Sequence, residues 1–220
     1  MEDKSRVRPL LLFALLAGLG LAGGLALTVL KPAKLAEENH QPPGIEGLIW
    51  PNSLALKPFS IVDHQGANFG LEQLAGKWSF LFFGYVHCPD VCPLTLAVLN
   101  NVSQILGSQS DVEGPLQFVF VSIDPDRDTI GELSKHIENF SDNFVAATGS
   151  EQDLATLTQQ VGIASARNPQ ADGPYLVDHT SAVLLIDPDG NLVGLFSAPH
   201  EANAMASRFR QIVTYVQEHG

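Results

Sequence analysis

The longest apolar stretch of the chain lies close to its N-terminus. It runs from Leu10 to Leu30, carries no charge and has Thr28 as its single polar side chain. A helix rises about 1.5 Å per residue, so this stretch would be about 31 Å long, enough to cross the hydrocarbon core of a bilayer. We therefore predict a transmembrane helix at residues 10–30. The alternative is a cleaved signal peptide, whose apolar region usually has only about 7 to 15 residues.

Basic residues flank this stretch on both sides, and the tail that precedes it is too short to be a translocated domain. We therefore expect residues 1–9 to be a cytoplasmic tail and the rest of the chain to lie across the membrane. Residues 31–51 contain four prolines and show no periodicity, which predicts a linker. Residues 52–220 are then expected to form one domain.

Within this domain, short apolar runs predict the strands. Residues 59–62 and 67–69, separated by a turn at 64–66, predict a hairpin. Unbroken apolar runs are typical of strands that are buried on both faces, as in a parallel sheet. Three such runs occur, at residues 78–85, 118–123 and 182–186, and a turn at 187–190 leads from the last into a further strand at 192–196.

Apolar residues at helical spacing predict the helices. The first helix follows the segment Cys88–Pro93, and its inner face carries Leu94, Ala97, Val98, Val102 and Ile105. Asp128 or Thr129 is expected to cap a second helix that runs to Phe140, and Ser150 a third. The last is an amphipathic helix at residues 202–217.

The order of these elements predicts an α/β sandwich that resembles the thioredoxin class, with an N-terminal transmembrane helix. Both cysteines of the chain lie at the first junction between a strand and a helix. The handedness of the crossover would place them at the carboxyl edge of the sheet, where α/β proteins keep their sites.

Charge narrows the possible functions. The chain has 12 Lys and Arg residues against 24 Asp and Glu residues, a net charge of -12. A nucleic-acid-binding protein needs the opposite sign, so we expect no nucleic-acid partner. Cationic or metal-bearing partners suit this charge better. With only two cysteines, the chain is also not a disulfide-dense scaffold.

Cys88 and Cys92 are the strongest chemical signal. If both lie in the first turn of the helix, they share one face, where two thiols can form a disulfide or bind a soft metal. The free N–H groups of a helix start stabilise a thiolate. A purely structural disulfide is less favoured, because so short a loop loses little chain entropy. The three intervening residues also argue against a standard disulfide exchanger, which uses Cys-x-x-Cys.

His179 is a candidate third ligand. It directly precedes the strand at 182–186, and if that strand is parallel to the first, we expect His179 at the same edge of the sheet as the cysteines. Two thiolates alone can hold Cu(I), whereas a third ligand would make a trigonal site that also suits Cu(II). A lone histidine beside a strand is more often a surface residue, so both interpretations remain open on the residues alone.

Three sequence blocks resemble the Sco (SenC) family of membrane-anchored proteins, which help to build the copper centre of cytochrome c oxidase. The first is Phe83–Pro93 (FGYVHCPDVCP), the second is Val121–Thr129, and the third combines Val177–Ser181 with Asp187–Gly190. The resemblance covers about residues 50–217. It implies a thioredoxin-like fold in which Cys88, Cys92 and His179 bind copper as Cu(I) and Cu(II).

The resemblance also implies partners and a location. These are the copper-bearing subunit of cytochrome c oxidase and other copper chaperones or thiol reductases. The protein would be a single-pass protein of the inner (cytoplasmic) membrane, with its C-terminal domain on the periplasmic side. Whether it is an enzyme stays open, because Cys88 and Cys92 could also act as a catalytic redox pair in a thiol-disulfide oxidoreductase that reduces the cysteines of the oxidase site. A thiol peroxidase is disfavoured, since no Arg or Thr flanks Cys88.

The other polar residues near these motifs receive simpler interpretations. We expect His87 to be a bystander beside the site and Asp90 to cap the helix. Asp178 either orients His179 or begins a turn. The segment 124–128 is expected to be a solvated turn with a helix cap. The remaining histidines are expected to have ordinary roles; they are His40, His64, His136, His200 and His219.

Overall fold

A central strand, β4 (Trp78–Gly84), organises the fold, and all seven of its residues are buried. The computed structural model describes residues 44, 48–108 and 114–219. Among these residues, no helix is long and apolar enough to cross a membrane. The predicted tail and transmembrane helix, residues 1–30, and most of the predicted linker lie outside the described residues.

An eight-stranded mixed sheet forms around β4. β5 (Leu116–Ser122) pairs with β4 in parallel and β6 (Phe144–Thr148) with β5 in parallel, whereas β9 (Val183–Ile186) pairs with β4 antiparallel. The strand order is β1-β10-β9-β4-β5-β6-β2-β3. The outer strands are β1 (Ile49–Ala55), β2 (Ile61–Asp63), β3 (Asn68–Phe69) and β10 (Asn191–Phe196).

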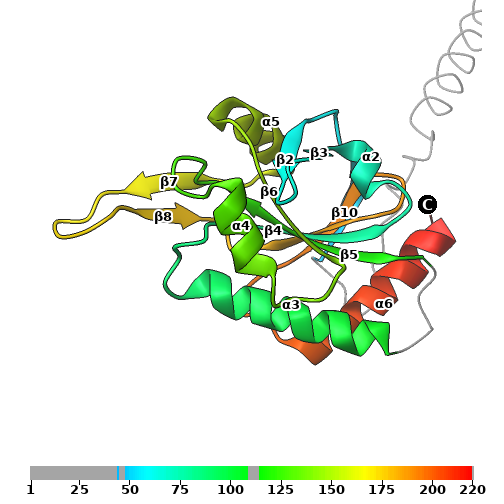
Figure 1. Cartoon of the computed structure of the whole chain (residues 1–220). Helices are drawn as coiled ribbons and strands as arrows, with labels where there is room; N and C mark the ends of the chain where they lie inside the picture. Colours follow the sequence, from blue (N-terminus) through cyan, green and yellow to red (C-terminus); the bar gives the residue numbers. More distant parts are fainter. Residues whose placement is uncertain (1–43, 45–47, 109–113, 220) are drawn as a thin grey trace, which may run out of the picture. The chain divides into compact units, whose positions relative to one another are not determined.

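Helices cover both faces of the sheet (Figure 1). Because side chains alternate along a strand, Phe80 and Phe82 of β4 face one layer, and Leu81 and Phe83 face the other. The first layer contains α3 (Val91–Gly107), α4 (Ile130–Ile137) and α6 (Ala202–His219). The second contains α2 (Leu71–Leu74) and α5 (Glu151–Val161).

Most of the predicted elements are present. The predicted caps are confirmed, because the side chains of Thr129 and Ser150 accept hydrogen bonds from the backbone N–H groups of Glu132 and Asp153. α4 ends at Ile137, before the predicted end at Phe140. The sequence patterns missed β6 and α2, and β1 begins at Ile49, inside the segment predicted as a linker.

A second sheet was also missed. It is a hairpin of β7 (Ser165–Asn168) and β8 (Leu176–His179), which projects from the body of the domain (Figure 1). All four residues of β7 are exposed, so this strand lacks the apolar alternation by which a half-buried strand is recognised. The hairpin ends at His179 and therefore delivers one of the candidate ligands.

Candidate metal centre

Both cysteines lie at the carboxyl end of β4, as predicted. Cys92 is in the first turn of α3, but Cys88 lies in the loop that connects β4 to this helix. The two cysteines therefore do not share a helical face. They meet instead because the loop folds back over the start of the helix, where the N–H groups of Asp90 and Cys92 interact with the sulfur of Cys88. Neither cysteine is part of a disulfide.

The last residue of β4 packs closely against the side chain of Cys92. Its side chain is fully buried, and a Cβ atom on Gly84 would lie 2.7 Å from its Sγ atom and 3.0 Å from the ring of Phe120. These separations are shorter than ordinary contacts, so only glycine fits at position 84 without a displacement. The position of the buried thiol is thus fixed by the last residue of β4.

His179 reaches the cysteines by a different route from the one expected. The strand that follows it, β9, runs antiparallel to β4, with Val183 opposite Phe82. The placement of His179 was made on the condition that this strand is parallel to β4, and both the condition and the geometry drawn from it were wrong. The start of a parallel strand would lie at the amino end of β4, whereas the start of an antiparallel strand lies at the carboxyl end, beside the cysteines.

The structure brings Cys88, Cys92 and His179 together. One donor atom from each lies within 4.8 Å of the other two, and the Sγ atom of Cys92 is 3.5 Å from Nε2 of His179. In the described part of the chain, this is the one group of three or more such side chains that are close enough to hold a metal ion.

The orientation of the His179 ring is set by a backbone carbonyl. Its Nδ1 atom lies 3.0 Å from the carbonyl oxygen of Thr180. A carbonyl oxygen only accepts hydrogen bonds, so Nδ1 is the donor, and in the neutral ring the lone pair is then on Nε2, which faces the cysteines. Asp178 does not orient the ring, because its carboxylate accepts a hydrogen bond from the side chain of Asn168 instead.

The two thiols have opposite electrostatic environments. Burial raises the pKa of Cys88, but hydrogen bonds from the N–H groups of Asp90 and Cys92, the Cys92 thiol and the Tyr85 hydroxyl outweigh it, and the net pKa is lowered. Burial raises the pKa of Cys92 far above its usual range. The free N–H groups at the helix start therefore favour a thiolate at Cys88, as expected, whereas Cys92 stays protonated in the metal-free protein.

The segment 124–128 is only in part the solvated turn that the sequence suggested, because Asp126 is exposed but two other acidic residues are not. Asp124 and Asp128 are both fully buried. Asp128 accepts hydrogen bonds from the backbone N–H of Val86 at 2.8 Å and from the hydroxyl of Ser122 at 2.5 Å. The prediction failed because acidic residues are rarely buried without partners, and these partners come from elsewhere in the chain.

His87 and Asp90 flank the cysteines in the sequence but contribute no donor atom to the cluster. Nδ1 of His87 lies 3.3 Å from the Asp128 carboxylate, and half of the His87 side chain is exposed. The ring thus contacts the buried acid rather than either sulfur. Asp90 occupies the N-cap position of α3, but its side chain makes no capping hydrogen bond.

None of the other described histidines belongs to this cluster. His64 and His200 each contact a backbone group of the sheet region, and His219 contacts its own helix. Burial lowers the pKa of His136, which packs against the ring of Phe120. His40 lies outside the described residues.

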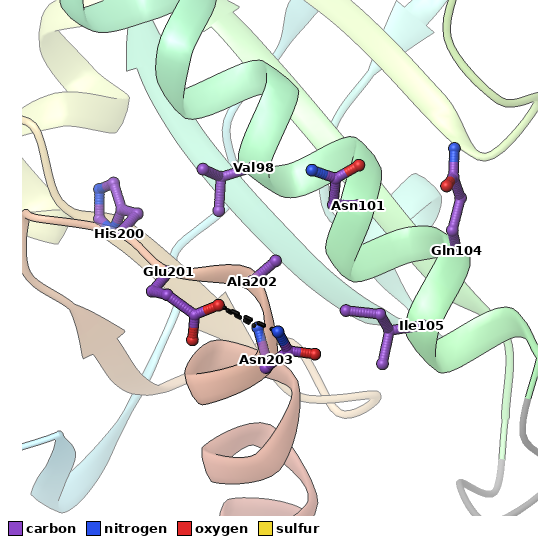
Figure 2. A pocket seen from close by; sticks show the side chains of 8 residues that line it. All are labelled: Val98, Asn101, Gln104, Ile105, His200, Glu201, Ala202 and Asn203. Carbon is purple, nitrogen blue, oxygen red and sulfur yellow. Dashed lines mark hydrogen bonds between the residues drawn. The ribbon is translucent and has the colours of Figure 1, made fainter.

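A separate groove of about 460 Å³ lies between α3 and the start of α6 (Figure 2). Asn101 and Gln104 of α3 line one side, and Glu201 lines the other. The Glu201 carboxylate accepts hydrogen bonds from the backbone N–H groups of Asn203 and Ala204 and so caps α6. None of the three candidate metal ligands lines this groove.

Comparison with known proteins identifies the family. The SCO1/SenC family model matches residues 51–214. The mitochondrial protein SCO2 homolog of Bos taurus is 30% identical over 207 residues, which cover 93% of this chain and 75% of the relative.

Two solved structures agree with this match. The crystal structure of ScoI from Arabidopsis thaliana with copper bound is 28% identical, with a TM-score of 0.68 over 72% of this chain and 98% of that one. BsSco, a member of the Sco family of cytochrome c oxidase assembly proteins, is 23% identical, with a TM-score of 0.58 over 74% of this chain and 95% of that one. The mixed α/β fold is therefore the thioredoxin-like fold of these proteins, and the chain belongs to the SCO1/SenC family.

Proposed function

We propose that this protein binds one copper ion through Cys88, Cys92 and His179 and carries it to a partner. The observation that supports this most strongly is the convergence of two sulfur atoms and one imidazole nitrogen within 4.8 Å. Donor atoms bound to one ion at about 2.0 to 2.3 Å are at most about 4.6 Å apart, so small side-chain movements suffice to close the site. A relative of similar fold was crystallised with copper bound.

The donor set favours copper over the commoner zinc. Thiolate and imidazole ligands suit both copper and zinc, so the number of ligands distinguishes the two metals. A structural zinc site normally has four protein ligands, whereas three converge here. The intermediate exposure of Cys88 and His179 leaves the site open on one side, which a carrier needs in order to receive and release an ion.

We further propose that the recipient is the copper-bearing subunit of cytochrome c oxidase, and that residues 10–30 anchor the protein to the inner membrane with its domain on the periplasmic side. The oxidase role is supported by the three motifs shared with the Sco family and by the description of BsSco as an oxidase assembly protein. The anchor is supported by the length and apolarity of residues 10–30.

The asymmetry of the two thiols favours a second candidate function, reduction of a partner disulfide. The thiolate of Cys88 would attack one sulfur of the partner disulfide and form a mixed disulfide, while the other partner sulfur leaves as a thiolate. Cys92, once deprotonated, would then attack Cys88 and release the second partner thiolate. Two electrons pass to the partner, and Cys88 and Cys92 remain as a disulfide.

Copper titration of the full-length protein in detergent tests the first proposal. Reduced protein should bind one Cu(I) ion per chain in competition with a chelator, and Cys88→Ser or Cys92→Ser should abolish tight binding. The control is Ser103→Ala, since Ser103 is a polar residue of α3 that contacts Asn143 rather than the cluster. Tight Cu(I) binding by either cysteine variant would disprove the proposed site.

A further inference from the structure

Apolar contacts anchor the β7–β8 hairpin only weakly. All four residues of β7 are exposed, and Val177 is the one buried residue of β8. A two-stranded hairpin by itself is at best marginally stable in water. Because His179 is the last residue of β8, its position depends on whatever else holds this hairpin against the domain.

Arg167 of β7 forms ion pairs with two exposed acidic side chains of the domain, and three further polar residues supply the buried part of the attachment. Tyr175, directly before β8, donates a hydrogen bond from its hydroxyl to Oδ1 of Asp124 at 2.6 Å. Arg127 donates one from Nη1 to the carbonyl oxygen of Tyr175 at 2.9 Å and another from Nε to the Asp124 carboxylate. Asp124 is fully buried, so this charge requires both partners.

The same group reaches the candidate metal centre. The guanidinium carbon of Arg127 lies 3.8 Å from the ring centroid of Tyr175 and 5.5 Å from that of Tyr85. The ring of Tyr85 meets the ring of His179 edge-on, with a centroid separation of 6.2 Å and an interplanar angle of 89°. A continuous series of contacts therefore runs from the buried acid to the imidazole.

We propose that Asp124, Arg127 and Tyr175 form a latch that positions His179 beside the cysteines and so determines how well the site holds Cu(II). The three are positioning residues, since they act through the hairpin and through Tyr85. This inference rests on the proposed copper function. Two thiolates can bind Cu(I) in a linear arrangement without His179, whereas Cu(II) needs the third donor. The latch should therefore matter far more for Cu(II) than for Cu(I).

Tyr175→Phe is the sharpest perturbation, because it removes the hydroxyl and keeps the ring that Arg127 covers. In metal-free reduced protein, backbone amides of residues 176–179 should exchange with solvent about tenfold faster, the effect of losing about one hydrogen bond to a charged group. The dissociation constant for Cu(II) should rise by about the same factor, while that for Cu(I) should change by less than about twofold.

Two further variants separate positioning from general stability. Ser103→Ala removes a partly buried hydroxyl that bonds Asn143 between α3 and β6, away from the hairpin. It should leave both the exchange of residues 176–179 and the ratio of the two copper affinities unchanged. Arg127→Lys keeps the charge but loses the forked hydrogen bonds to Asp124 and Tyr175, so it should behave like Tyr175→Phe rather than like the control.

Each outcome decides a different claim. Equal weakening of Cu(I) and Cu(II) binding by Tyr175→Phe, or unchanged amide exchange, would overturn the latch while leaving the copper function intact. If the unmodified protein binds no copper, the proposed function fails, and amide exchange in the metal-free variants alone decides whether the latch holds the hairpin.

Discussion

Replacing Gly84 by alanine tests whether the end of β4 fixes the buried thiol of Cys92. The new Cβ atom would lie 2.7 Å from the Cys92 sulfur, and ordinary contacts begin at 3.4 Å, so the sulfur or the strand must move by about 0.7 Å. The ring of Phe120 lies 3.0 Å from the same position, so the new methyl group cannot avoid the sulfur by moving toward this ring. Overpacking of this kind typically costs about 1 to 3 kcal/mol of unfolding free energy.

Both stability and metal binding should respond to this change. The melting temperature should fall by roughly 3 to 10 °C for a domain of this size. Ligands need to be held within about 0.5 Å of their working positions, so we expect the Cu(I) affinity to fall by about tenfold. Thermal unfolding followed by circular dichroism and Cu(I) competition titration measure the two effects.

Gly107→Ala is the matched control. Gly107 is the last residue of α3, and nothing lies within 4 Å of its ideal Cβ position. Alanine is favoured over glycine in helices, so this variant should be at least as stable as the unmodified protein and should bind Cu(I) equally well. A Gly84→Ala protein that matched this control in both stability and Cu(I) affinity would refute the packing of Cys92 described above.

Three other predictions follow. His179→Ala should remove tight Cu(II) binding and weaken Cu(I) binding only modestly; unchanged Cu(II) absorption spectra would contradict this. Cys88, whose pKa is lowered, should react with iodoacetamide before Cys92, and peptide mass spectrometry identifies the site; initial modification of Cys92 would contradict the description of the two thiols. The stability of the metal-free reduced protein should fall as the pH rises above about 8.5, because unfolded Cys92 loses its proton there and folded Cys92 does not. Chemical denaturation should show no such fall in Cys92→Ala, and an equal fall would exclude Cys92 as its cause.

The features that depend only on a short stretch of the chain were predictable from the sequence. The buried strand β4 appears as an unbroken apolar run, and the helix caps Thr129 and Ser150 stand directly before periodic segments. The cysteine pair follows from its place between a strand and a helix. Each of these signals lies within a few neighbouring residues, where local geometry alone decides the outcome.

The features that depend on distant partners were not predictable in this way. Asp124 looks like a solvated acid in the sequence, and its burial depends on Tyr175, which lies 51 residues further along the chain. The antiparallel direction of β9 is a property of the whole sheet, and the run at 182–186 is equally apolar in either direction. For the same reason, the residues near His179 could not show that it lies beside the cysteines. The resemblance to the family motifs supplied that prediction instead.

X-ray absorption spectroscopy of the copper-loaded, full-length protein tests the central claim most directly, because it counts the donor atoms around the metal. We expect one copper ion per chain, coordinated by two sulfur atoms and one imidazole nitrogen in the Cu(II) form, and by two sulfur atoms without an imidazole in His179→Ala loaded with Cu(I). Coordination by oxygen and nitrogen alone, or by a single sulfur atom, would contradict the assignment of Cys88, Cys92 and His179 as the copper site.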